Sequence, residues 1–90
     1  MVIKLTDKAK EKILERNKKG IPVKVAITGY SWCGANIGIV SEKQEKDDKI
    51  YKIEGANIVV SSDLIDSMKS MTIEYSNNWL TKGFEVIPEF

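Results

Sequence analysis

Cys33 is the residue whose chemistry stands out first, because it is the single thiol of the 90-residue sequence. A thiolate is a soft, anionic donor that can bind iron, and it can also act as a nucleophile in redox or persulfide chemistry. Glycines flank it in the segment 29–36, where converging backbone N–H groups would stabilise a thiolate. The alternative is a small buried hydrophobic side chain, as many free cysteines are. Both interpretations stay open.

The sequence contains no histidine, which removes several classes of site. Ser-His-Asp triads, Cys-His nucleophile pairs, histidine general bases and zinc sites with imidazole ligands are all excluded. A single cysteine also excludes an intrachain disulfide and is typical of a reducing compartment. We therefore expect a protein of the cytoplasm that is not an enzyme.

The charge balance and hydropathy indicate which partners to expect. The sequence has fourteen basic and thirteen acidic residues. The resulting net charge of +1 argues against binding of DNA or RNA. No apolar run approaches the roughly 20 residues that cross a bilayer, so we expect no membrane association. An apolar fraction of 42% with 30% charged residues is that of one ordinary folded domain, which we expect to span residues 1–90.

Other polar and aromatic side chains have simpler interpretations. Tyr30 and Trp32, beside the thiol, could form a partner-facing patch or pack in the core, and both interpretations stay open. The acidic residues of 42–49 do not predict a calcium loop, because lysines interleave them and the EF-hand glycine is missing; a solvated hairpin turn is the better prediction. Asp63 is explained as a helix cap, as Ser61 or Ser62 also would be.

The first half of the sequence predicts one helix between strands. Residues 2–5 favour a strand, Thr6 a helix N-cap and Gly20 the end of the helix over 7–17, whose basic C-terminal end we interpret as solvated. Alternation in 23–28 predicts a half-buried strand. A loop over 29–36 and a strand over 37–40 follow.

The second half favours more strands and a short helix. We expect strands over 50–53, 58–61, 71–76 and 84–87, a helix from about 62 to 70, and a turn at Asn77 and Asn78. Strands and helices do not alternate strictly, so a parallel doubly wound sheet is not expected. The predicted fold class is α+β, mainly antiparallel, with about six or seven strands in curled or sandwich-like sheets, one longer N-terminal helix and one short helix.

The order of these elements, and a series of residues along nearly the whole chain, resemble one family. In the second half the matching residues are Gly55, Ile58, Val59, Val60, Asp63, Leu64, Ile73, Glu74, Tyr75, Gly83, Phe84 and Pro88. They fall in the order typical of the HesB-like family of A-type (IscA-type) iron-sulfur carriers and scaffolds. The resemblance implies a HesB-like domain.

The resemblance also implies a function and a site. Family members typically hold iron or an iron-sulfur cluster between subunits, through one loop cysteine and a C-terminal Cys-Gly-Cys. This sequence has no counterpart of the Cys-Gly-Cys, and alignment on Gly34 puts Trp32 at the family's loop position with Cys33 one place later. Cys33 is therefore the one candidate ligand for iron or a cluster that the resemblance carries over. The implied partners are a second copy of the chain and iron-sulfur assembly or apo-client proteins.

Ligand number decides between the functional hypotheses. A [2Fe-2S] cluster usually takes four thiolates, whereas one chain offers one and a symmetric dimer two. The first hypothesis is therefore a binding protein that holds iron or a labile cluster through Cys33 at a subunit interface. The alternatives are a thiol-redox or persulfide-handling protein that uses Cys33 as nucleophile, and a metal-free protein-interaction module.

Overall fold

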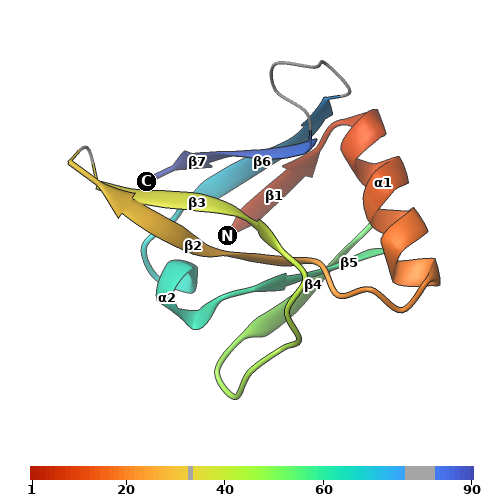
Figure 1. Cartoon of the computed structure of the whole chain (residues 1–90), viewed down its shortest axis with the longest axis horizontal. Coiled ribbons are helices and arrows are strands. Elements are labelled where there is room, and N and C mark those ends of the chain that lie inside the picture. The colour runs from red at the N-terminus through yellow and green to blue at the C-terminus, as the bar shows by residue number, and fades with distance from the viewer. Residues whose placement is uncertain (33, 77–82) are drawn as a thin grey trace.

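The computed structural model describes residues 1–32, 34–76 and 83–90, which form seven strands and two helices (Figure 1). This confirms the predicted α+β class with one longer N-terminal helix and one short helix. None of the helices in these ranges is long and apolar enough to cross a membrane. In chain order the elements are β1 (Val2–Leu5), α1 (Asp7–Lys18), β2 (Lys24–Ser31), β3 (Gly34–Val40), β4 (Lys49–Ile53), β5 (Ala56–Val60), α2 (Ser62–Ile65), β6 (Ser70–Ser76) and β7 (Gly83–Glu89).

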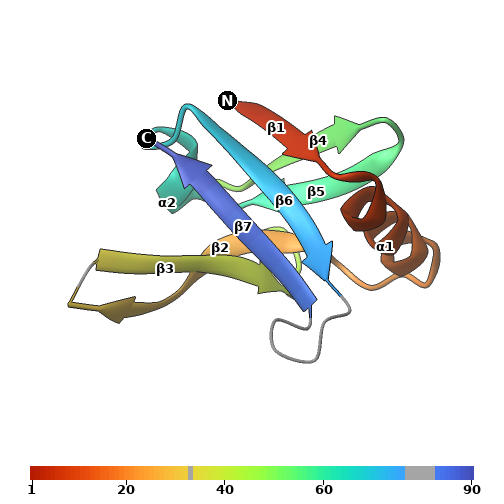
Figure 2. The same cartoon turned by 90° about the horizontal axis from the view of Figure 1, so that it is seen from above.

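The strands form two sheets. A three-stranded sheet has the order β1-β6-β7 and a four-stranded sheet the order β3-β2-β5-β4. The pairs β2–β3, β4–β5 and β6–β7 are antiparallel, whereas β1–β6 and β2–β5 are parallel. The two sheets face each other across the molecule (Figure 2). The sheets are thus mixed, with antiparallel pairs in the majority among the described strands.

Local signals set both ends of α1. The Thr6 side chain accepts a hydrogen bond from the Ala9 amide at 3.3 Å, which confirms the predicted N-cap. Gly20 has a φ of +76°, and its N–H donates to the Asn17 carbonyl while the next amide, of Ile21, donates to Arg16. This pair of bonds is a Schellman motif, which ends a helix by satisfying its last carbonyls. The predicted stop at Gly20 is confirmed.

One hydrophobic core joins the two sheets and both helices. Helix α1 contacts β5 of one sheet and β6 of the other, and it covers one end of the molecule, whereas α2 lies at the opposite end against β2 (Figures 1 and 2). Met68 and Met71 lie in this core, as predicted. The core residues are Ile3, Ala9, Ile13, Val23, Val25, Ala56, Ile58, Val60, Leu64, Met68, Met71, Ile73 and Val86.

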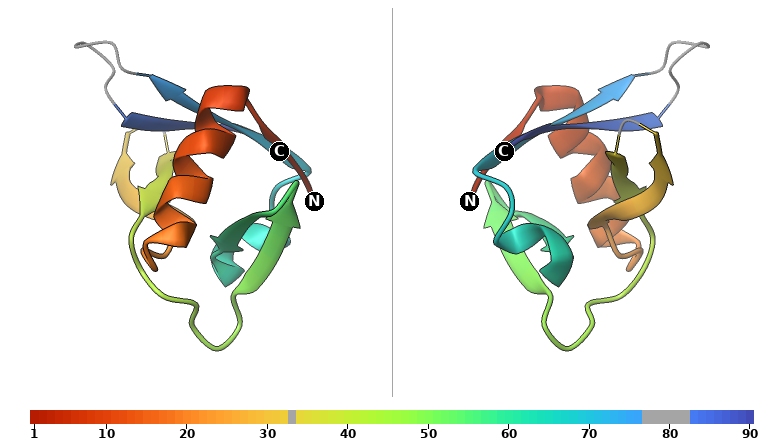
Figure 3. Two further views of the ribbon diagram at one scale, coloured as in Figure 1. Left: turned by 90° about the vertical axis from the view of Figure 1, so that its right-hand side faces the viewer. Right: turned by 90° about the vertical axis from the view of Figure 1, so that its left-hand side faces the viewer.

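The predicted hairpin turn over residues 42–49 is wrong. Strands β3 and β4 lie at opposite edges of the four-stranded sheet, so this segment runs between the two edges and connects no neighbouring pair (Figure 3). Polarity indicated correctly that most of the segment is exposed. It carried no information on pairing, because β2 and β5 come to lie between the two strands only in the folded sheet.

Helix α2 is shorter than predicted and is capped differently. It ends at Ile65, well before Ser70, and the Ser61 side chain makes no capping bond. The amide of Ser62 donates instead to the Asp48 carboxylate at 2.9 Å, so the cap comes from a distant segment. The proposed capping role of Asp63 is therefore wrong. The turn predicted at Asn77 and Asn78 lies outside the described residues.

Candidate functional site

The segment around the candidate ligand is a β-hairpin. The predicted loop over 29–36 is wrong, because β2 continues to Ser31 and β3 begins at Gly34, with Gly29 opposite Asn36 and Ser31 opposite Gly34. Small and polar residues gave no apolar alternation, yet their backbones pair in the ladder all the same. Gly34 has a φ of +121°, a conformation that favours glycine at the point where β3 begins.

The end of this hairpin presents aromatic side chains to solvent. Tyr30 is 79% exposed and Trp32 is 98% exposed, so neither packs in the core. The Ser31 hydroxyl donates to the Gly34 carbonyl at 3.3 Å across the pair that closes the ladder. This end of β2 and β3 lies on the side of the molecule away from α1 (Figures 1 and 2).

A bulge marks the point where the hairpin leaves the core. Ile27 pairs with Ile37 and Gly29 with Asn36, so Thr28 is the extra residue, and its hydroxyl donates to the Asn36 carbonyl at 3.4 Å. A bulge increases local twist and changes the direction of the strand. From this point to Gly34 most of the hairpin is exposed.

The predicted ligand, Cys33, lies outside the described residues. Its neighbours in the sequence are the exposed Trp32 and Gly34. Over residues 1–32, 34–76 and 83–90, no three acidic or metal-ligating side chains gather into a group that could hold a metal ion. One chain on its own therefore does not supply the donor set of a cluster within the described part.

A buried ion pair, not predicted from the sequence, joins Lys24 and Asp48. The Lys24 ammonium lies 2.8 Å from the Asp48 carboxylate, and both side chains are buried. Asp48 also accepts hydrogen bonds from the amides of Glu45 and Ser62, each at 2.9 Å. The prediction that Asp48 belongs to a solvated turn is therefore wrong. Its partner lies on β2, far away in the sequence, and no local pattern pointed to it.

The pair shifts the titration of both groups. Hydrogen bonds from the Lys24 ammonium and from two backbone amides lower the pKa of Asp48 from 3.8 to about 2. The hydrogen bond to Asp48 raises the pKa of Lys24 above its ordinary 10.5, against the opposing effect of burial. Both side chains are charged near neutral pH, so the pair serves to join β2, the segment before β4 and α2.

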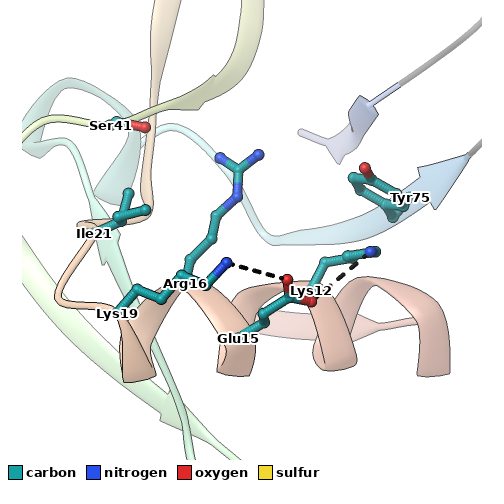
Figure 4. A pocket seen from close by; sticks show the side chains of 7 residues that line it. All are labelled: Lys12, Glu15, Arg16, Lys19, Ile21, Ser41 and Tyr75. Carbon is teal, nitrogen blue, oxygen red and sulfur yellow. Dashed lines mark ion pairs between the residues drawn. The ribbon is translucent and has the colours of Figure 1, made fainter.

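A groove lies beside α1, on a different side of the molecule from the hairpin end. Its volume is about 430 Å³. Glu15 lies 3.8 Å from the Lys12 ammonium and 3.5 Å from that of Lys19 (Figure 4). The Arg16 guanidinium carbon lies over the Phe84 ring, 4.9 Å from its centroid. The lining residues are Lys12, Glu15, Arg16, Lys19, Ile21, Ser41 and Tyr75.

Comparison with known proteins found similarity in structure only. No family model and no curated protein matches the sequence. Escherichia coli SufA, described as involved in biosynthesis of iron-sulfur clusters, superposes with a TM-score of 0.70 over 96% of this chain and 79% of its own, at 23% identity. The chain has the SufA fold. The resemblance drawn from the sequence is thereby confirmed as one of fold.

Two further solved structures have the same fold. IscA with the [2Fe-2S] cluster gives a TM-score of 0.67 at 12% identity, over 97% of this chain and 85% of its own. An Aquifex aeolicus protein gives 0.65 at 15% identity, over 97% of this chain and 91% of its own. At this level of sequence identity the similarity shows a shared architecture. The chemistry of this protein depends on its own residues.

Proposed function

We propose that this protein takes part in iron-sulfur cluster biosynthesis as a non-enzymatic carrier, and that it binds iron or a labile cluster through Cys33. The observation that carries the proposal is the shared fold over 96–97% of the chain with SufA and with IscA, one tied to cluster biosynthesis and the other solved with a cluster. Cys33 supports it as the single soft anionic donor of the sequence.

The proposed site is shared between subunits. Each chain supplies one thiolate, and the described residues add no metal-binding group of their own. Two chains that meet at the ends of their β2–β3 hairpins bring two thiolates together, and small cellular thiols complete the coordination. A cluster bound in this way is cargo that exchanges readily, which suits a carrier in the cytoplasm.

The exposed aromatic residues of the hairpin support an interface at this position. Trp32 and Tyr30 are among the side chains that contribute most to protein–protein contacts when buried, and both face solvent in the single chain. The partner is a second copy of the chain or an apo-client protein. In either case the contact would exclude water from the thiolate and its metal.

Anaerobic reconstitution with iron and sulfide tests the carrier function. Wild-type protein is expected to develop thiolate-to-iron absorption and to shift to a larger species in sedimentation, whereas Cys33→Ser is expected to do neither. Ser67→Ala, a substitution at an exposed position outside the hairpin that keeps the thiol, is the control and should load like wild type. A colourless wild type, or a Cys33→Ser variant that loads normally, would contradict the proposal.

A thiol function is the second candidate, because it needs only the single thiol that the chain has. In this case Cys33 acts as a nucleophile toward disulfides or persulfides, and a depressed thiol pKa is required. Alkylation rates measured against pH would show a reactive thiolate below pH 8.5. A slow thiol with an ordinary titration, together with failed reconstitution, would leave the metal-free interaction module.

A further inference from the structure

We propose that the groove beside α1 binds a small dianion, a phosphate monoester or a dicarboxylate, with the Arg16 guanidinium as its central group. The groove is defined by Lys12, Glu15, Arg16, Lys19, Ile21, Ser41 and Tyr75. This ligand site involves neither Cys33 nor the hairpin end, so it stands apart from the carrier function.

The groove brings together donors from α1, from the segment after β3 and from β6. Lys12, Arg16 and Lys19 follow one another at spacings of four and three residues, which puts them on one face of the helix and its C-terminal turn. Ser41 follows β3 and Tyr75 belongs to β6, so their hydroxyls come from elsewhere in the fold. Figure 4 shows Arg16 pointing into the space between Ser41 and Tyr75.

The lining has more positive than negative charge. Glu15 is its one carboxylate and lies within ion-pair distance of both lysines, at 3.8 and 3.5 Å. None of the ion pairs formed among the described residues involves Arg16. Three cations against one carboxylate leave a local surplus of two positive charges, in a chain whose net charge is only +1. A ligand with two negative charges matches this surplus.

Arg16 is held in place before any ligand arrives. Its guanidinium carbon lies over the Phe84 ring, 4.9 Å from the ring centroid, and Phe84 in turn meets Tyr75 edge-on with a centroid distance of 4.9 Å. This contact leaves the guanidinium without an ion-pair partner among the described residues, so its N–H groups can donate to a ligand. A planar fork of this kind binds phosphate or carboxylate oxygens in pairs, and its fixed position lowers the entropic cost of binding.

The ordinary explanation for basic residues at a helix C-terminus covers only part of this arrangement. Arg16 and Lys18 in the last turn, and Lys19 at the C-cap, complement the negative end of the helix dipole. That effect falls off within the last turn and does not extend to Lys12, whose ammonium lies 3.8 Å from Glu15 and 5.4 Å from the centroid of the Tyr75 ring. It also does not account for the two hydroxyls, and the last carbonyls are already bonded in the Schellman motif. A ligand site accounts for all of these groups together.

Amide NMR titrations at constant ionic strength test the proposal, with inorganic phosphate, phenyl phosphate and succinate as probes. Saturable shifts are expected at 12–19, 41 and 75. Arg16→Gln, which keeps a good helix former, should weaken binding about tenfold or more, because it removes a bidentate charged donor. Arg16→Lys, which keeps the charge but loses the fork, should fall between that variant and wild type.

Lys52→Gln is the matched control, since it removes the same charge from an exposed position on β4. It should leave the affinity within about twofold of wild type. Tighter binding of the two phosphates than of succinate assigns a phosphate ligand, and the reverse assigns a dicarboxylate. Shifts that do not saturate with any probe, or an equal loss in Lys52→Gln and Arg16→Gln, would overturn the proposal. Thermal melts of each variant verify that the fold is retained.

Discussion

Asp48 is a single carboxylate on which three segments depend. It binds the Lys24 ammonium on β2, the Glu45 amide in the preceding segment and the Ser62 amide at the start of α2. Removal of one partner from a buried ion pair leaves the other charge without compensation, which is strongly destabilising. The position of the segment that links the two edges of the sheet therefore depends on this buried carboxylate, through its ion pair and its two hydrogen bonds from backbone amides.

The lowered pKa of Asp48 predicts an acid-sensitive contribution to stability. Because the folded-state pKa of about 2 is below the ordinary 3.8, this contribution is complete above about pH 4 and disappears as the pH falls to about 2. Asp48→Asn should lower the unfolding midpoint at pH 6 and flatten the dependence on pH between 2 and 4. Urea unfolding over this pH range measures both effects.

Asp47→Asn, which changes an exposed neighbour, is the control for Asp48→Asn and should follow the wild-type pH profile. Addition of Lys24→Met to Asp48→Asn should restore part of the stability, because the uncompensated ammonium is then gone. Identical pH profiles for the wild type and Asp48→Asn would contradict the assignment.

At the scale of elements, the β4–β5 hairpin shows a local conflict between sequence and structure. Its two turn residues, Glu54 and Gly55, have φ values of +49° and +90° and connect the paired residues Ile53 and Ala56. Positive φ at both positions is the type I′ turn that Asn-Gly favours, and glutamate is poorly suited to it. The compensating ion pair of Glu54 with Lys10, at 3.3 Å, is exposed and worth little.

Glu54→Asn is therefore expected to stabilise the protein by about 0.5–1 kcal/mol, since asparagine tolerates the left-handed conformation. The free energy of unfolding in urea measures the change. Glu54→Gln loses the same ion pair without this tolerance, so it should be no more stable than wild type. A gain in Glu54→Gln equal to that in Glu54→Asn would mean that charge, and not backbone conformation, explains the effect.

At the scale of the whole molecule, the two sheets share one core and are expected to unfold together. Helix α1 contacts β5 in one sheet and β6 in the other, and completely buried residues such as Ile58 and Ile73 contribute from both sides. A small domain with one continuous core usually unfolds in a single cooperative transition. Loss of packing in either sheet should therefore destabilise both.

Ile58→Ala tests this shared core. Truncation of a fully buried isoleucine should cost about 2–5 kcal/mol. Amide signals from β5 and from β6 should disappear at the same denaturant concentration. Ile50→Ala, at a 54% exposed position on the adjacent strand, should cost far less. Separate midpoints for the two sheets would contradict a single core.

The sequence by itself determined the elements whose signals lie within a few residues. Thr6 and Gly20 marked the ends of α1, because capping and a positive φ are local properties. Period-two alternation located β2, but it put Lys24 on the polar side of the strand, whereas Lys24 is buried beside Val25. The order of elements, together with the series of residues from Gly55 to Pro88, also indicated the HesB-like fold, and Cys33 could be chosen as the candidate ligand because no other residue has its chemistry.

Only the tertiary structure decided which segments meet. It placed β3 and β4 at opposite edges, buried Asp48 against Lys24, exposed Trp32 at the end of the hairpin and set Arg16 on the ring of Phe84. Each of these features depends on where residues that are distant in the chain lie relative to one another. Their energies come from burial and from charges brought close by packing, and neither is encoded in the neighbouring residues of any one segment.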